Sequence, residues 1–239
     1  TKELPAASVR LVLIADSHLG VTMDGEDFSA EIERIRQTQP DIVVVGGDFV
    51  DDASHKSDMI QACKALGSLK TTYGVYFVFG NHDEGYSKES RDFSEDDLRK
   101  ELLANRVTIL EDESLLIADS FYLIGRKDKS AKIRAGIDEL TAPLDNSKYM
   151  IVLDHQPNDY EKEAAAGVDL VLSGHTHGGH IFPAGPLGIL IGSNDAYYGL
   201  SHRENTDFIV TSGISGWEIP LKTGAISEYV VIDISTKAP

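Results

Sequence analysis

Five short blocks of polar residues could bind metal ions, because each contains the aspartate, asparagine or histidine side chains that proteins use as ligands for divalent cations. One carboxylate can bridge two cations while imidazole nitrogens and an amide oxygen complete each coordination shell. Two ions held side by side in this way would assist the attack of water on phosphorus. The blocks are Asp16-Ser17-His18, Gly47-Asp48, Gly80-Asn81-His82-Asp83, His155 and Gly174-His175-Thr176-His177.

Each of the first three blocks follows a segment that predicts a buried strand. Residues 9–15 are largely apolar and end at Asp16, residues 41–48 repeat this pattern, and residues 75–79 lead to Asn81. Helical patterns separate these strands. The alternation predicts parallel strands with right-handed crossovers, whose carboxyl ends meet at one edge of a sheet.

The rest of the chain predicts more strands than helices. Ser94 and the acidic residues after it predict a helix start. Glycine, proline and tyrosine are abundant in residues 178–199, which predicts a loop and hairpin region beside the site. A helix is predicted over residues 160–166, a meander over residues 108–110, 114–117 and 121–124, and strands at 150–153, 170–173, 208–211 and 229–234.

Length and composition are those of a single globular α/β domain that comprises residues 1–239. Hydrophobic residues make up 41% of the chain and charged residues 26%, and no linker-like segment divides it. The formal net charge of −17 predicts repulsion of a polyanion, so nucleic acid is not an expected partner. A local positive field around two metal ions would still accept a small phosphate ester.

The single cysteine, Cys63, excludes an intramolecular disulfide and a thiolate metal site. No apolar run approaches the roughly 20 residues that span a bilayer, and no signal peptide is present. The chain begins at Thr1 and not at Met, so an N-terminal anchor or signal could have preceded it. We expect a membrane-associated or exported protein in that case and a cytoplasmic one otherwise, and the oligomeric state stays open.

The five blocks closely resemble, in the right order from about residue 9 to residue 180, the signature motifs of the calcineurin-like metallophosphoesterase superfamily. The resemblance implies a four-layer α/β/β/α sandwich of two mixed sheets, with metals bound by loops at one edge. It also implies hydrolysis of a phosphodiester or phosphomonoester by attack of a hydroxide that bridges two metal ions.

The resemblance further assigns a role to each residue of the blocks. His82 stabilises the transition state or protonates the leaving oxygen, and Asp83 orients His82 by accepting a hydrogen bond from its second ring nitrogen. The ligand set admits Mn²⁺, Fe, Zn²⁺ or Ni²⁺, of which we expect Mn²⁺. One ion is assigned Asp16, His18, Asp48 and His177, and the other is assigned Asp48, which bridges, with Asn81, His155 and His175.

Structural roles compete with these functional ones. An isolated Asp-x-His or Gly-Asp is commonplace and by itself is more often structural than a metal ligand. Gly174-His175-Thr176-His177 fits a structural role less well, because two buried imidazoles cost stability unless metals or hydrogen bonds satisfy them. The combination of blocks therefore favours a metal centre.

Five further residues have weaker claims. His180 either touches substrate or caps its loop, and Asp154 either hydrogen-bonds a ligand or lies exposed. Trp217 belongs to the core or rim, or forms a platform for substrate. We expect His55 and His202 at the surface.

Residues 174–179 and 212–220 are most similar to exported or membrane-anchored bacterial phosphoesterases, whose relatives include lipid-acting pyrophosphatases. A lipid-precursor pyrophosphatase is therefore one alternative function. Another is a metal-binding scaffold for protein interactions, against which the presence of His82 and every metal ligand argues. Residues 182–198 and Trp217 predict a cleft with apolar and aromatic walls, suited to small phosphate esters.

Overall fold

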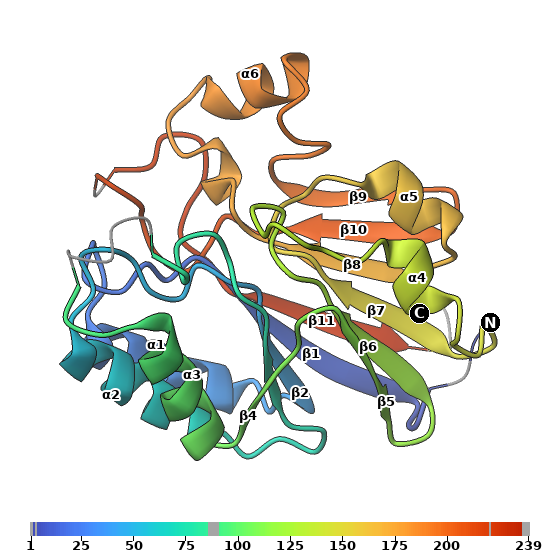
Figure 1. The fold of residues 1–239 in the computed structure, drawn as a ribbon, viewed down its shortest axis with the longest axis horizontal. Helices are drawn as coiled ribbons and strands as arrows, with labels where there is room; N and C mark the ends of the chain where they lie inside the picture. Colours follow the sequence, from blue (N-terminus) through green and yellow to red (C-terminus); the bar gives the residue numbers. More distant parts are fainter. Residues whose placement is uncertain (1, 3, 86–90, 220, 236–239) are drawn as a thin grey trace.

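Two mixed β-sheets form the body of the protein in the computed structural model, which describes residues 2, 4–85, 91–219 and 221–235 (Figure 1). The first sheet has the strand order β11-β1-β2-β3-β4. Strands β1 to β4 are parallel, and β11 pairs antiparallel with β1 at the edge. These strands are β1 (Ser8–Ile14), β2 (Ile42–Val45), β3 (Val75–Phe77), β4 (Val107–Ile109) and β11 (Val230–Ser235).

The second sheet has the strand order β5-β6-β7-β8-β10-β9. Its four inner strands are parallel, while β5 and β9 pair antiparallel at the two edges. The strands are β5 (Glu113–Ile117), β6 (Phe121–Gly125), β7 (Tyr149–Leu153), β8 (Leu170–Ser173), β10 (Thr206–Val210) and β9 (Gly199–Arg203).

Helices cover the outer face of each sheet, so the layers run helix, sheet, sheet, helix (Figure 1). This confirms the predicted α/β/β/α sandwich. Beside the first sheet lie α1 (Gly25–Gln37), α2 (Lys56–Gly67) and α3 (Glu95–Ala104). Beside the second lie α4 (Ile137–Thr141) and α5 (Tyr160–Ala165).

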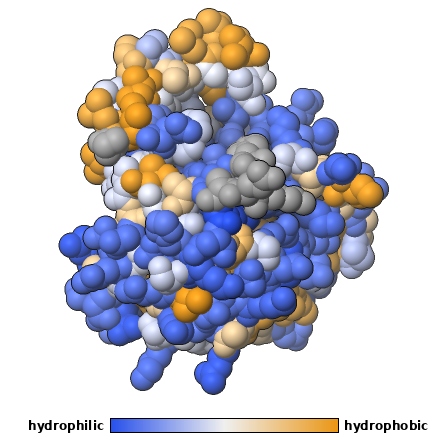
Figure 2. Space-filling view, turned by 60° about the vertical axis from the view of Figure 1, so that its left-hand side comes forward, coloured by the Kyte–Doolittle hydropathy of each residue, from blue (hydrophilic) through white to orange (hydrophobic). Residues whose placement is uncertain are grey.

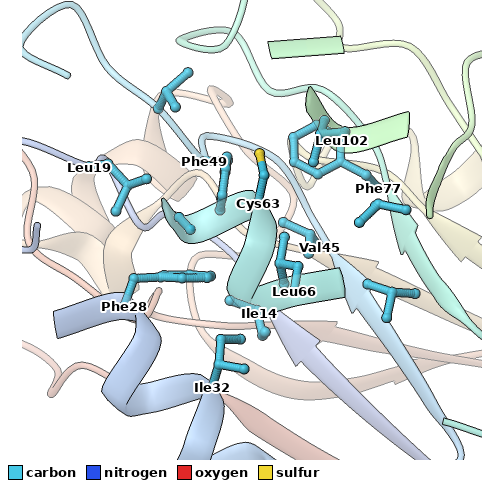
Figure 3. Packing of buried hydrophobic residues seen from close by; sticks show 14 of the residues in the cluster. Ile14, Leu19, Phe28, Ile32, Val45, Phe49, Cys63, Leu66, Phe77 and Leu102 are labelled. Atoms are coloured by element: carbon cyan, nitrogen blue, oxygen red, sulfur yellow. The ribbon is translucent and has the colours of Figure 1, made fainter. Parts of the chain in front are cut away.

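Both faces of the central strands are buried, which explains their apolar sequences. Leu11 and Leu13 of β1 point into the core between the sheets, whereas Val12 and Ile14 point into the core beneath the helices. Figure 3 shows this second core, in which the thiol of Cys63 is packed among aliphatic and aromatic side chains. The alternation fixes the register of the strands and thereby the positions of the loops that follow them.

Helix starts follow local hydrogen-bond chemistry. The side chain of Ser94 accepts from the backbone N–H of Asp97, and the Asp97 carboxylate accepts from the backbone N–H of Ser94. The predicted cap at Ser94 is confirmed. Asp24 and Asp27 form the same capping box at the start of α1.

Two predictions for residues 107–199 were wrong, and one short helix was not predicted. Strand β4 pairs with β3 in the first sheet, so it does not form a meander with the hairpin β5-β6. Residues 178–199 contain a helix, α6 (Ala184–Leu190). It was predicted as a loop because it contains glycine and proline. The five residues of α4 were missed because so short a helix has almost no periodicity. None of the helices in the described part of the chain is long and apolar enough to cross a bilayer.

Candidate dinuclear metal centre

The predicted ligands lie in loops that follow the carboxyl ends of strands in both sheets. Asp16 follows β1 by two residues, and Asp48 follows β2 by three. His155 and His175 each follow a strand of the second sheet, β7 or β8, by two residues. The backbone N–H of Asp16 donates to the carbonyl of Gly47 at 3.0 Å, which ties two of these loops together.

One cluster joins Asp16, His18 and His177, whose ligand atoms lie within 4.8 Å of one another. Nδ1 of His18 lies 2.6 Å from Oδ2 of Asp51, and an ionised carboxylate can only accept, so Nδ1 carries the proton and Nε2 presents its lone pair. That lone pair points toward Nε2 of His177, 3.0 Å away. Burial and the neighbouring His18 lower the pKa of His177 to about 2, so the ring is neutral near pH 7.

A second cluster joins Asp48, His155 and His175, again within 4.8 Å. Nδ1 of His155 donates to the carbonyl of Gly46 at 2.7 Å, which leaves Nε2 facing Oδ2 of Asp48 at 3.1 Å. Two lone pairs at this distance repel unless a proton or a metal ion lies between them. Burial lowers the pKa of His155, but the charge of Asp48 outweighs it and raises that pKa well above its usual value.

Asp48, a member of the second cluster, also faces the first cluster. Its Oδ2 lies 3.7 Å from Nε2 of His18 and 3.1 Å from Nε2 of His155, while its Oδ1 accepts from the backbone N–H of His82 at 2.8 Å. The carboxylate is therefore fixed by its first oxygen and aims its second oxygen at both clusters. This is the position that a bridging ligand needs.

The donor atoms fit divalent cations. Carboxylate oxygens and imidazole nitrogens converge in a buried space. Burial raises the pKa of Asp16 to about 6, which shows the cost of leaving its charge uncompensated. Asn81 is buried in the turn after β3 and directly precedes His82, whose backbone N–H donates to Asp48. The role of Asn81 as a ligand stays a prediction.

Backbone conformation at the site is unusual. Asp16, His18, Asp48, His175 and His177 all have positive φ, between 38° and 72°, a region that non-glycine residues rarely adopt. The surrounding contacts hold these residues in place.

Gly174 explains the glycine of the fifth block. A Cβ at this position would lie 2.5 Å from Oδ2 of Asp16. The backbone N–H of the next residue, His175, donates to Asp16 at 2.9 Å. Only a glycine allows the loop after β8 to approach the first cluster this closely.

His82 lies beside the clusters, but its orienting partner differs from the predicted one. Nδ1 of His82 lies 3.3 Å from Oδ2 of Asp51, the same oxygen that His18 contacts. Asp51 was not predicted, because its contact with His82 depends on the turn that follows Asp48. Its position three residues after Asp48 was the one sequence signal for a role at the site. Burial raises the pKa of Asp51, but its bonds with the two histidines outweigh this and hold that pKa well below its usual range.

Asp83 has a structural role that replaces the predicted one. Its Oδ1 accepts from the backbone N–H groups of Phe49 and Val50 at 2.8 and 3.0 Å, and its Oδ2 accepts from that of Gly80 at 2.8 Å. The carboxylate thus joins the loop after Asp48 to its own turn. The prediction that Asp83 orients His82 was wrong, because both of its oxygens are directed at the backbone.

Of the weaker candidates, Trp217 and His180 lie beside the site, whereas Asp154 belongs to a separate group of ion pairs. The ring centroid of Trp217 lies 5.7 Å from that of His82 and 6.2 Å from that of His177, so the indole lies over the site and not in the core. The ring centroid of His180 lies 6.3 Å from that of Trp217. Asp154 is buried, and it pairs with Arg126 at 2.9 Å and with Arg134, so neither predicted role applies.

His55 and His202 are exposed, as predicted. His55 is the N-cap residue of α2, and His202 pairs with Asp207 on the neighbouring strand. Neither contributes to the two clusters.

Comparison with known proteins agrees with this geometry. The sequence pattern of the calcineurin-like phosphoesterases matches residues 9–179. The chain belongs to this family. A metallophosphoesterase of Helicobacter pylori strain J99 is 31% identical over 232 residues, which are 96% of this chain and 60% of that protein. A bovine "transmembrane protein with metallophosphoesterase domain" is 30% identical over 92% of this chain and 52% of its own length.

The chain thus spans about half to three fifths of these relatives. Among solved structures, a dimetal phosphatase from Danio rerio shares the fold with a TM-score of 0.54 at 12% identity, over 86% of this chain and 87% of that one. Residues 9–179 therefore belong to a calcineurin-like phosphoesterase domain. With the two clusters, this membership indicates a dinuclear centre of divalent ions.

We predict that Asp48→Ala removes more metal than any other single ligand substitution, because only Asp48 faces both clusters. Elemental analysis after loading with Mn²⁺ and dialysis measures the metal content. Asp207→Ala, which removes an exposed carboxylate, is the control and should keep two equivalents. Two equivalents retained by Asp48→Ala would show that it does not bridge.

We predict that Asp83→Ala lowers the free energy of unfolding by about 3 kcal/mol, because three backbone N–H groups lose a buried acceptor. Chemical denaturation monitored by circular dichroism measures this change. The control is Asp52→Ala, which should change stability by less than about 0.5 kcal/mol. An Asp83→Ala variant of normal stability with a greatly reduced kcat would instead restore the orienting role.

Proposed function

We propose that the chain is a dinuclear, manganese-dependent hydrolase of small phosphodiesters or phosphomonoesters. The observation that carries this proposal is the position of Asp48, whose Oδ2 faces imidazoles of both clusters. When bound, two divalent ions would polarise the phosphoryl oxygens and activate a water molecule between them. The residues that would hold them are Asp16, His18, Asp48 and His177 on one side, and Asp48, Asn81, His155 and His175 on the other.

His82 would hold the proton that the leaving oxygen receives. Burial lowers its pKa, but the bond with Asp51 and the charges of Asp48 and Asp51 raise it above its usual value. More of the ring is therefore protonated near pH 7 than for a free histidine. Since Asp51 contacts Nδ1, it also sets the orientation of the ring.

The surroundings of the site favour small substrates over nucleic acid. The densest basic segment is residues 126–134, but Arg126 and Arg134 are held in ion pairs with Asp154. Lys222 donates to the carbonyl of Ser212 at 2.6 Å, so its charge is partly engaged. With a net charge of −17, the protein has little to neutralise successive phosphates.

Two alternatives have different support. A protein-interaction scaffold does not need the bond between Asp51 and His82 or the opposed lone pairs at Asp48. A lipid-precursor pyrophosphatase would use the same centre, and the exposed apolar residues beside it favour a lipid-borne substrate. The name of the bovine relative includes "transmembrane". We likewise propose that a segment outside residues 1–239 associates this protein with a membrane.

We predict that His82→Ala lowers kcat by about 10²- to 10⁴-fold, because the leaving oxygen loses its proton donor. Steady-state hydrolysis of bis-p-nitrophenyl phosphate with Mn²⁺ measures kcat, and elemental analysis should show normal metal content. His202→Ala, at an exposed histidine, should retain wild-type activity. An unchanged kcat in His82→Ala would exclude the proposed role.

We predict that hydrolysis of bis-p-nitrophenyl phosphate greatly exceeds cleavage of duplex DNA at physiological salt, because the site lacks a basic path for the backbone. Parallel assays with p-nitrophenyl phosphate separate diesterase from monoesterase activity. Efficient cleavage of long DNA that weakens with salt would contradict the charge argument. Inactivity on all three substrates would favour the scaffold.

A further inference from the structure

An apolar lobe adjoins the metal centre. We use this name for the exposed side chains on and around α6 and on the loop that follows Trp217. Ten of the fifteen large apolar side chains that are exposed among the described residues lie between Phe182 and Ile226. Figure 1 shows α6 standing away from both sheets, and Figure 2 shows apolar residues gathered at that end of the molecule. The lobe comprises Phe182, Leu187, Leu190, Ile191, Ile219, Leu221 and Ile226.

The helix in this lobe has no polar face. Only Gly185 of its seven residues is buried, and its sequence, AGPLGIL, contains no charged or hydrogen-bonding side chain. Leu190 and the next residue, Ile191, are 80% and 76% exposed. A surface helix normally has a polar side for water, whereas a helix that is apolar all round belongs in apolar surroundings. A protein groove that covered one side would leave the others in water.

The part of the apolar lobe around α6 carries no charged side chain. Residues 181–194 contain no Asp, Glu, Lys, Arg or His, although the chain as a whole carries a net charge of −17. An uncharged protrusion on an acidic body is compatible with an electrically neutral apolar surface. The acidic body would be repelled by an anionic one.

Short connections join the lobe to the metal centre. The backbone N–H of Phe182 donates to Oγ1 of Thr223 at 2.8 Å, and the N–H of Thr223 donates to the carbonyl of His180 at 2.9 Å. The lobe therefore begins five residues after the predicted ligand His177. A Cβ on Gly185 would lie 2.5 Å from the ring of Tyr197, so the base of α6 is closely packed.

We propose that the apolar lobe inserts into the surface of a neutral phospholipid bilayer, and that the metal centre acts on a phosphate ester carried by a lipid in that bilayer. Apolar side chains on several sides of α6 favour a fluid lipid environment over a protein groove. The absence of charged side chains around α6 favours an electrically neutral membrane surface. The substrate half of this proposal rests on the proposed hydrolysis, whereas insertion does not.

The first test is partitioning of the full chain onto phosphatidylcholine vesicles, measured by co-sedimentation. Leu190→Ser should weaken partitioning about tenfold, because a side chain that enters the bilayer loses its apolar carbons. Leu103→Ser is the matched control, since Leu103 is a helical leucine, 57% exposed, on α3 outside the lobe. Vesicles with added phosphatidylglycerol should bind less protein than neutral ones.

A second test locates the inserted part. Cys63 is buried, so Leu190→Cys and Leu103→Cys can each be labelled selectively with an environment-sensitive fluorophore. Emission from the label at position 190 should shift to the blue when neutral vesicles are added. Emission from position 103 should not change.

The outcomes separate this proposal from the proposed function. Absence of partitioning, equal losses in the two serine variants, or a Leu190-dependent dimer in analytical ultracentrifugation without vesicles would overturn insertion. Turnover of bis-p-nitrophenyl phosphate in solution should be the same in wild type and Leu190→Ser. Vesicle binding without any turnover would support insertion and refute the hydrolase.

Discussion

The carboxylate of Asp48 is almost fully buried, and its Oδ2 faces imidazole nitrogens that come from both sheets. Nδ1 of His18 contacts Asp51 and Nδ1 of His155 contacts the carbonyl of Gly46, so Nε2 of both rings faces the same oxygen of Asp48. Such an arrangement is stable only with positive charge at its centre. Divalent cations would supply that charge, and under the proposed function their position would determine where a phosphate ester is attacked.

The surrounding structure serves this convergence. Parallel strands bring the loops of Asp16 and Asp48 to one end of the first sheet, and packing of the sheets brings His155 alongside them. Glycine at position 174 allows close approach to Asp16, and Asp83 holds the loop after Asp48 through three backbone bonds. Asp16, His18, Asp48 and His155 are thus held by hydrogen bonds or polar contacts that involve no metal. The site is preorganised at the cost of strained backbone.

The fold and the residues that form the two clusters could be predicted from the sequence because both depend on short-range patterns. An apolar strand that ends in Asp16 or Asp48 shows its burial and its chemistry within a few residues. The partner of His82 was assigned wrongly because Asp83 is the next residue in the sequence, whereas Asp51 lies 31 residues earlier, and only the turns decide which carboxylate faces the ring. Helix α6 was missed since it lacks the polar face from which amphipathic helices are recognised.

The central claim is that two divalent ions lie on either side of Asp48. The most direct measurement is an anomalous-scattering map from crystals of the protein loaded with Mn²⁺, collected near the manganese absorption edge. We expect two peaks about 3.5–4 Å apart, both within bonding distance of the Asp48 carboxylate. A single peak, or two peaks of which only one contacts Asp48, would contradict this account of the site.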